Sequence, residues 1–77
     1  MAFSALETIV LTRSVPDHGL MAGDLGTIVH LYDDGSAEVE FVTASGRTQA
    51  VVTLSAQDIR SVQPTDLVAV RPIDKSA

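Results

Sequence analysis

The stretch GTIVHLYDDGSAEVEFV, residues 26–42, decides the fold of this chain. Residues 37–41 (AEVEF) alternate apolar and acidic side chains, the period-two pattern of a strand with one buried and one solvated face. Residues 26–32 (GTIVHLY) are rich in β-branched and aromatic side chains, which favour strands, and the intervening Asp34-Gly35 pair is a strong hairpin signal. The stretch therefore predicts two antiparallel strands joined by a tight turn.

Strand-like segments on either side extend this hairpin into a meander. Residues 6–12 (LETIVLT) contain β-branched residues and no Gly or Pro, so they predict a preceding strand, followed by a loop at residues 13–24. On the other side, residues 48–54 (TQAVVTL) alternate again after a turn at residues 43–47. Four consecutive antiparallel strands are therefore expected.

The segment after the meander predicts one helical turn and a last strand. Ser55 can cap the amide of Asp58 while the Asp58 carboxylate reaches back, which is the capping-box arrangement. Residues 60–63 (RSVQ) then form a short strand that Pro64 stops, because proline cannot donate to a ladder. Five short strands with a 3-10 turn before the last one describe an all-β domain, a small five-stranded SH3-like barrel over residues 1–63.

The alternation also predicts which side chains fill the barrel. Ile28 and Leu31 are three positions apart, so both can point inward only if a bulge interrupts the strand. Without a bulge, Val29 would replace Ile28 inside. Ile28, His30 and Tyr32 would then lie on the outer face. With the bulge, the expected core consists of Ile9, Leu11, Leu25, Ile28, Leu31, Val39, Phe41, Ala50, Val52, Leu54, Ile59 and Val62.

Residues 64–77 form a C-terminal tail whose structure the pattern leaves open. The segment DLVAVR, residues 66–71, is as β-prone as the strands before it. It is interpreted as a sixth strand, as a segment exchanged between copies, or as a frayed end near Pro72. Because an exposed edge strand recruits another strand, these residues also predict a homodimer.

The composition excludes several kinds of chemistry. The chain has 77 residues, which corresponds to one domain, and no cysteine, which excludes disulfides, thiolate zinc sites and cysteine nucleophiles. A net charge of −5 disfavours binding to nucleic acid or anionic lipid and favours basic or neutral protein surfaces. Without an N-terminal signal segment or an apolar run of 18 residues, a cytoplasmic protein that does not contact a membrane is expected.

The segment AGDLGTIVHLY, with IVLTRSVPDHGL before it and RTQAVVTLSAQDIRSV after it, resembles a family of short bacterial proteins, domain of unknown function 4926. The resemblance covers Leu6 to Val62 and implies an SH3-like barrel without an agreed biochemical function. The same segment is similar to the KOW motif of ribosomal and transcription-factor barrels, which implies a nucleic-acid-associated barrel as the alternative function. KOW proteins that hold RNA usually carry Lys and Arg around this loop, whereas this chain carries Asp17, Asp24, Asp33 and Asp34.

Small-ligand and catalytic sites are not expected. Potential metal ligands occur at Asp17, His18, Asp24 and His30, but no H-E-x-x-H or H-x-H spacing is present. The glycines at positions 19, 23 and 26 match neither the dinucleotide nor the P-loop pattern, so they are interpreted as residues that shape a loop and let a strand start close to its neighbour. A filled barrel of this size also leaves no room for a large pocket, so no catalytic residue, metal or cofactor is predicted.

The remaining expectation is a non-enzymatic protein–protein interaction module. The loop at residues 13–24 carries apolar side chains that a partner can contact, and tyrosine is a favoured interface anchor. Alternatively, the apolar loop residues plug the end of the barrel. The partner is expected to be another protein that the domain serves as an accessory or antitoxin-like subunit, or a second copy through residues 66–71. The predicted partner-binding residues are Val15, Pro16, His18, Leu20 and Met21 on the loop and, if the strand has no bulge, Ile28, His30 and Tyr32 on its outer face.

Overall fold

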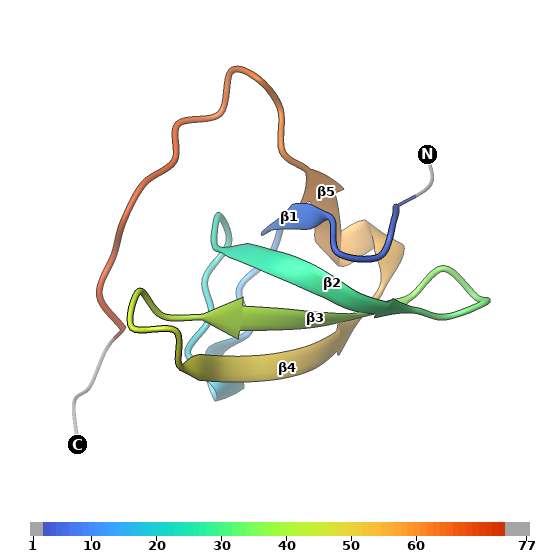
Figure 1. The fold of residues 1–77 in the computed structure, drawn as a ribbon, viewed down its shortest axis with the longest axis horizontal. Helices are drawn as coiled ribbons and strands as arrows, with labels where there is room; N and C mark the ends of the chain where they lie inside the picture. The colour runs from blue at the N-terminus through green and yellow to red at the C-terminus, as the bar shows by residue number, and fades with distance from the viewer. Residues whose placement is uncertain (1–2, 74–77) are drawn as a thin grey trace.

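Five antiparallel strands form one curled sheet in the computed structural model, which describes residues 3–73. The strands are β1 (Thr8–Leu11), β2 (Leu25–Leu31), β3 (Ala37–Val42), β4 (Thr48–Leu54) and β5 (Ile59–Ser61). Their order in the sheet is β4-β3-β2-β1-β5, so four strands follow one another and β5 returns to pair with β1 (Figure 1). The predicted five-stranded SH3-like barrel is confirmed.

Two 3-10 turns complete the fold. The turn η2 (Ala56–Asp58) precedes β5, and its capping box joins the side chains and amides of Ser55 and Asp58 as the sequence predicts. The turn η1 (Pro16–His18) lies within the predicted loop at residues 13–24. Within the described residues 3–73 neither turn continues as an α-helix, and no helix is long and apolar enough to cross a membrane.

A β-bulge in β2 decides which of its side chains face the core. Ile28 pairs with Val39 and His30 pairs with Glu38, so Val29 is the extra residue on the β2 side. Ile28 is fully buried and Leu31, two positions beyond the bulge, packs against the same core. The bulged register is therefore correct, and the alternative that places Ile28 on the outer face is wrong.

The core lies on the concave side of the sheet and is almost entirely aliphatic. Two expected members are wrong: Leu25 is 40% exposed and Val62 is 38% exposed. Alternation explains Leu25, because Gly26 and Ile28 point inward ahead of the bulge and Leu25 therefore points outward. Val62 follows the end of β5 and has the opposite parity to the buried Ile59. The buried apolar residues are Ile9, Val10, Leu11, Leu20, Ile28, Ala37, Val39, Phe41, Ala50, Leu54 and Ile59.

Gly26 is required for the packing of β2 on β3. A Cβ atom on Gly26 would lie 2.6 Å from the Cγ1 atom of Val39 and 2.8 Å from the Cε2 atom of Phe41. Any side chain larger than hydrogen would therefore collide with the core. This close approach confirms the interpretation of Gly26 as the residue that lets a strand start near its neighbour.

The tail adds no sixth strand within the described residues. After β5 the chain leaves the sheet, and residues 66–73 run outside it as an extended strap, drawn from orange to red in Figure 1. The sixth-strand interpretation is therefore not met up to residue 73. The last four residues of the predicted tail, 74–77, lie outside the described residues.

Candidate interaction surface

The outer face of β2 presents an apolar and aromatic strip to solvent. Val29 is 42% exposed and Tyr32 is 41% exposed, because the bulge turns Val29 away from the core. The rings of His30 and Tyr32 meet edge to face with centroids 4.7 Å apart. Since each ring restricts the rotamers of the other, the strip carries two partly ordered rings.

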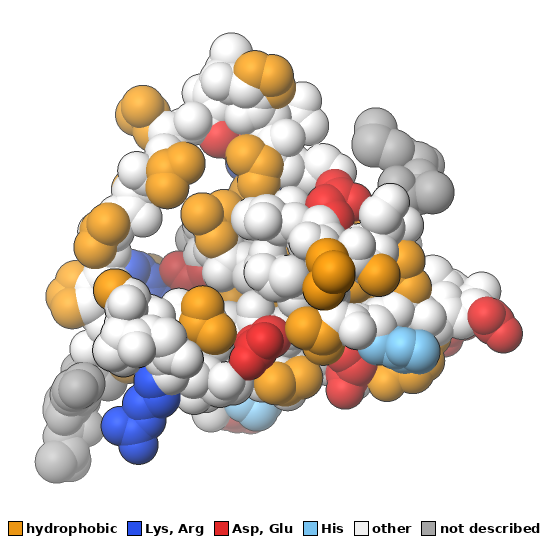
Figure 2. Space-filling model, in the orientation of Figure 1, with side chains coloured by type: hydrophobic (Ala, Val, Ile, Leu, Met, Phe, Trp, Pro, Cys, Tyr) orange, Lys and Arg blue, Asp and Glu red, His pale blue; other side chains and the backbone are white. Residues whose placement is uncertain are grey.

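Acidic side chains of β3 border this strip. Glu38 lies opposite His30 across the β2–β3 ladder, and Glu40 lies two positions further along β3. Each is held by a threonine of β4: Thr48 donates its hydroxyl to Glu40 at 2.6 Å, and Thr53 donates its hydroxyl to Glu38. In Figure 2, hydrophobic and acidic side chains alternate on the face turned to the viewer.

Five of the eight predicted partner-binding residues are exposed. Pro16, His18 and Met21 are exposed on the loop, and His30 and Tyr32 are exposed on β2. Two predicted contact residues are instead buried, and a third, Val15, is half-buried against the core. These two are Leu20, which is 3% exposed, and Ile28, which is fully buried.

The loop closes one end of the barrel. Leu20 packs in the core cluster, Val15 and Leu20 form an isolated bridge, and the Gln49 side chain donates to the carbonyl oxygen of His18 at 3.1 Å. The alternative reading, that apolar loop residues plug the barrel, is therefore correct for Val15 and Leu20. Because the loop covers the core side of the sheet, its exposed residues and the outer strip of β2 form two separate surfaces.

Three arginines are neutralised by carboxylates rather than gathered in a basic groove. Arg13 pairs with Asp58 at 2.8 Å, and hydrogen bonds from Arg13 lower the pKa of Asp58. Arg60 pairs with Asp66 at 2.9 Å. Three of the four arginines among the described residues therefore have a carboxylate partner.

Asp24 and Arg71 form the third pair, which joins the loop to the tail. The Arg71 Nε donates to the Asp24 Oδ1 atom at 2.8 Å, and its Nη2 donates to Oδ2. Partial burial raises the pKa of Asp24, but hydrogen bonds from Arg71 and the Met21 N–H outweigh it and leave the pKa below its ordinary value. Opposite charges 47 positions apart are the only sign of this pairing in the sequence.

The four potential metal ligands do not converge. Asp24 is engaged by Arg71, and His30 lies on the outer face against Tyr32. Across residues 3–73, no three His, Asp or Glu side chains come close enough to hold a metal ion.

Comparison with known families identifies the barrel. Residues 5–61 match the model of the family described as Domain of unknown function (DUF4926). The chain belongs to the DUF4926 family. The match begins before β1 and ends at the last residue of β5, so the DUF4926 domain corresponds to the barrel and leaves out the strap. Neither the curated proteins nor the solved structures gave a match to this chain.

Proposed function

We propose that this DUF4926 protein is a non-enzymatic interaction module that binds another protein in the cytoplasm through the outer face of β2. The observation that carries the proposal is the exposed strip of Val29, His30 and Tyr32. Aromatic residues with a polar end are enriched among the residues that dominate binding energy at protein interfaces. A strip held on a rigid strand also loses little conformational entropy when a partner docks.

The non-enzymatic part of the proposal rests on how the interior is filled. The largest side chains that are less than 2% exposed are Ile9, Leu11, Ile28, Leu54 and Val39. All of them are aliphatic, so the inside of the barrel supplies packing rather than acid, base or nucleophile. Chemistry at a dry internal site would need at least one buried polar group, and none of the described residues provides one.

The surroundings of the strip indicate the kind of partner. Glu38 and Glu40 stand beside it, and the chain carries a net charge of −5. A matching surface would present an apolar patch rimmed by Lys or Arg, because opposite charges at the rim steer encounter and fix orientation. A small acidic domain of this kind would suit an accessory or antitoxin-like role toward such a protein.

Affinity capture with matched variants tests the proposal. The immobilised wild type, Tyr32→Ala and Val42→Ala would each be exposed to lysate of the native cell. Val42 is 57% exposed at the far end of β3, so its substitution removes comparable apolar surface elsewhere. We expect one stoichiometric protein with the wild type and Val42→Ala, and its loss with Tyr32→Ala at an unchanged melting temperature. Recovery of RNA whose binding weakens steeply with salt would instead support the KOW-like alternative.

A further inference from the structure

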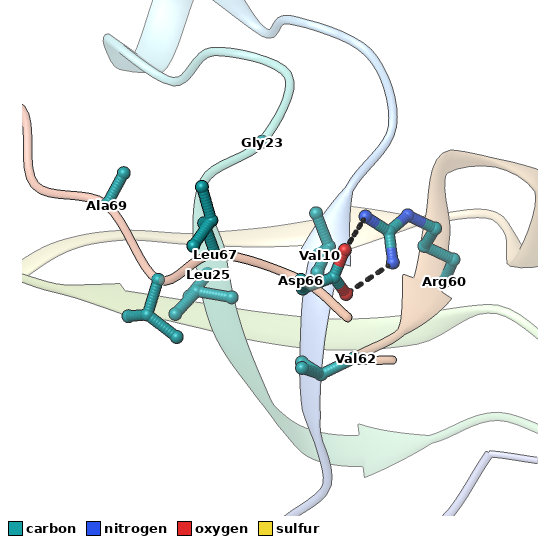
Figure 3. A pocket seen from close by; sticks show the side chains of 9 residues that line it. Val10, Gly23, Leu25, Arg60, Val62, Asp66, Leu67 and Ala69 are labelled. Atoms are coloured by element: carbon teal, nitrogen blue, oxygen red, sulfur yellow. Dashed lines mark hydrogen bonds and ion pairs between the residues drawn. The ribbon is translucent and has the colours of Figure 1, made fainter. Parts of the chain in front are cut away.

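The strap, defined as residues 66–73, is fastened at both ends and free between them. At its start, both oxygens of Asp66 accept hydrogen bonds from Arg60, at 2.9 and 3.0 Å (Figure 3). At its far end, Arg71 is held by the Asp24 carboxylate and by the carbonyl oxygen of Gly19, which accepts from Nη2 at 3.0 Å. The intervening residues 67–70 make no backbone hydrogen bond to the described part of the chain.

The acceptor site for Arg71 is built by the loop itself. The Asp24 carboxylate accepts the Met21 amide at 2.8 Å, and the Asp24 amide donates to the Met21 carbonyl at 3.0 Å. The Leu11 amide donates to the Asp24 carbonyl, which ties the loop to β1. These bonds do not involve Arg71, so the site is ready to accept a guanidinium from any chain that presents one in the same direction.

The strap covers an apolar patch on the outer face without filling it. Val10, Leu25 and Val62 lie on this face of β1, β2 and the residue after β5, and the strap passes over them (Figure 3). A hollow of about 140 Å³ remains between patch and strap. Meanwhile Leu67 and Val70 are 95% and 97% exposed. Within one chain, the strap therefore leaves its own apolar side chains exposed and the apolar patch beneath it incompletely covered.

Free backbone and exposed β-branched side chains are the features of an unpaired strand. Such a segment pairs readily with another extended chain. An antiparallel copy of the same segment is the simplest match, because a two-fold axis pairs identical residues across it. Ordinary flexible linkers are polar, whereas this one is LVAV.

Charge also favours a second copy of this chain as the occupant. Residues 1–66 hold nine acidic and three basic side chains, whereas residues 67–77 hold two basic and one acidic. Residues 67–77, which follow Asp66, thus carry a net charge of +1 on a molecule whose first 66 residues carry −6. Their complement is the barrel surface of the same protein, on which Asp24 already serves as the acceptor.

We propose that two copies exchange their straps, with Arg71 of each chain bound to Asp24 of the other and the two Leu67–Val70 segments paired antiparallel between the barrels. The Asp66–Arg60 pair stays within each chain and marks the hinge. The five Cα–Cα steps from Asp66 to Arg71 span up to about 17 Å when extended, enough to cross between adjacent barrels. The Asp66–Arg60 and Asp24–Arg71 pairs of the single chain are kept, and the strand pairing is added.

Sedimentation of the wild type and of Leu67→Lys/Val70→Lys tests the exchange. A tethered strap competes at an effective concentration of roughly 1 mM, so the dimer should appear at hundreds of micromolar. We expect the wild-type mass to rise from 8.1 kDa toward twice that value with concentration, and the double variant to remain monomeric with an unchanged melting temperature. A wild type that stays monomeric up to about 1 mM, or a double variant that dimerises equally well, would overturn the proposal.

Charge reversal tests the exchange of Arg71. Neither Asp24→Arg nor Arg71→Asp can form the pair within one chain, and neither alone should dimerise more tightly than the wild type. Mixing them should give a heterodimer that is tighter than the wild-type dimer, because residues 24 and 71 can then pair only across chains. Folding of each variant is checked first by its amide NMR spectrum. If Asp24→Arg does not fold, Asp24→Lys replaces it in the same mixture. A folded mixture that stays monomeric up to about 1 mM would contradict the exchange. Tyr32→Ala should dimerise like the wild type, which separates this test from that of the proposed partner surface.

Discussion

Arg71 binds both carboxylate oxygens of Asp24, a residue 47 positions earlier in the chain. This pair fastens the strap to the loop that closes the barrel, although the strap makes no strand with the sheet. The barrel and its strap are therefore linked by side chains rather than by a backbone ladder. Variants that break this link should change the strap and leave the barrel intact.

Arg71→Ala should release the strap in the monomer. At low protein concentration, the NMR order parameters of the amides at residues 67–70 should fall below about 0.6, while those in β1–β5 stay near 0.85. Arg13→Ala is the matched control, because it also removes an arginine–carboxylate pair but one that contacts Asp58 away from the strap. Equal order parameters in Arg71→Ala and the wild type would show that the Asp24 pair does not hold the strap.

Acid should destabilise the fold over a defined window. Hydrogen bonds from Arg60 and from the Gln63 amide lower the pKa of Asp66 to about 2, and those from Arg13 lower the pKa of Asp58. Because the folded pKa values lie below the ordinary value of 3.8, the unfolded chain binds more protons in between. The contribution of these two carboxylates to stability is therefore fully present above about pH 4 and is lost as the pH falls toward 2.

Thermal unfolding at a series of pH values checks this window. The melting temperature of Asp66→Asn should fall less steeply than that of the wild type as the pH is lowered, since one of the two carboxyl groups is absent. A wild-type melting temperature that is constant from pH 5 to pH 2 would show that these ion pairs contribute nothing to stability.

Phe41→Ala should cost about 3–5 kcal/mol, because it leaves a cavity in a core that is otherwise filled. Phe41 is only 3% exposed. The neighbouring Val42 is 57% exposed on the opposite face, so Val42→Ala should change the free energy of unfolding by less than about 0.5 kcal/mol. Urea denaturation measures both values. Similar losses for the two variants would mean that the assigned faces of β3 are wrong.

Gly26→Ala should destabilise the protein by about 1–3 kcal/mol through overpacking. The new methyl group would meet Val39 and Phe41 at distances that force one of the strands to move. Thr27→Ala, at the next position and on the outer face, serves as the control. Wild-type stability in Gly26→Ala would indicate that β2 and β3 lie further apart than described.

The sequence predicted local structure well because its signals were local. The alternation of residues 37–41, the Asp34-Gly35 turn and the Ser55–Asp58 capping box each depend on neighbours within a few positions, and all three are confirmed. The Tyr32 amide donates to the Ser36 carbonyl across the three turn residues 33–35. Gly35 has a φ of +90°, a conformation that favours glycine.

Features that depend on distant contacts were not predictable in the same way. The sequence alone does not decide whether β2 contains a bulge, since only the pairing of β2 with β3 shows which residue is extra. Leu25 was assigned to the core for its apolar side chain, although the parity set by Ile28 places it outside. The burial of Leu20 depends on the closure of the barrel, and the Asp24–Arg71 pair on the path of the strap.

The most direct test of the central claim is amide NMR of the labelled protein titrated with the purified protein that affinity capture recovers. The account predicts shifts or broadening at residues 29–32 of β2 and at adjacent residues of β3, with the resonances of Tyr32→Ala unaffected by the same addition. Changes confined to η2 and β5, or equal changes in the wild type and Tyr32→Ala, would contradict the assignment of the outer face of β2 as the binding surface.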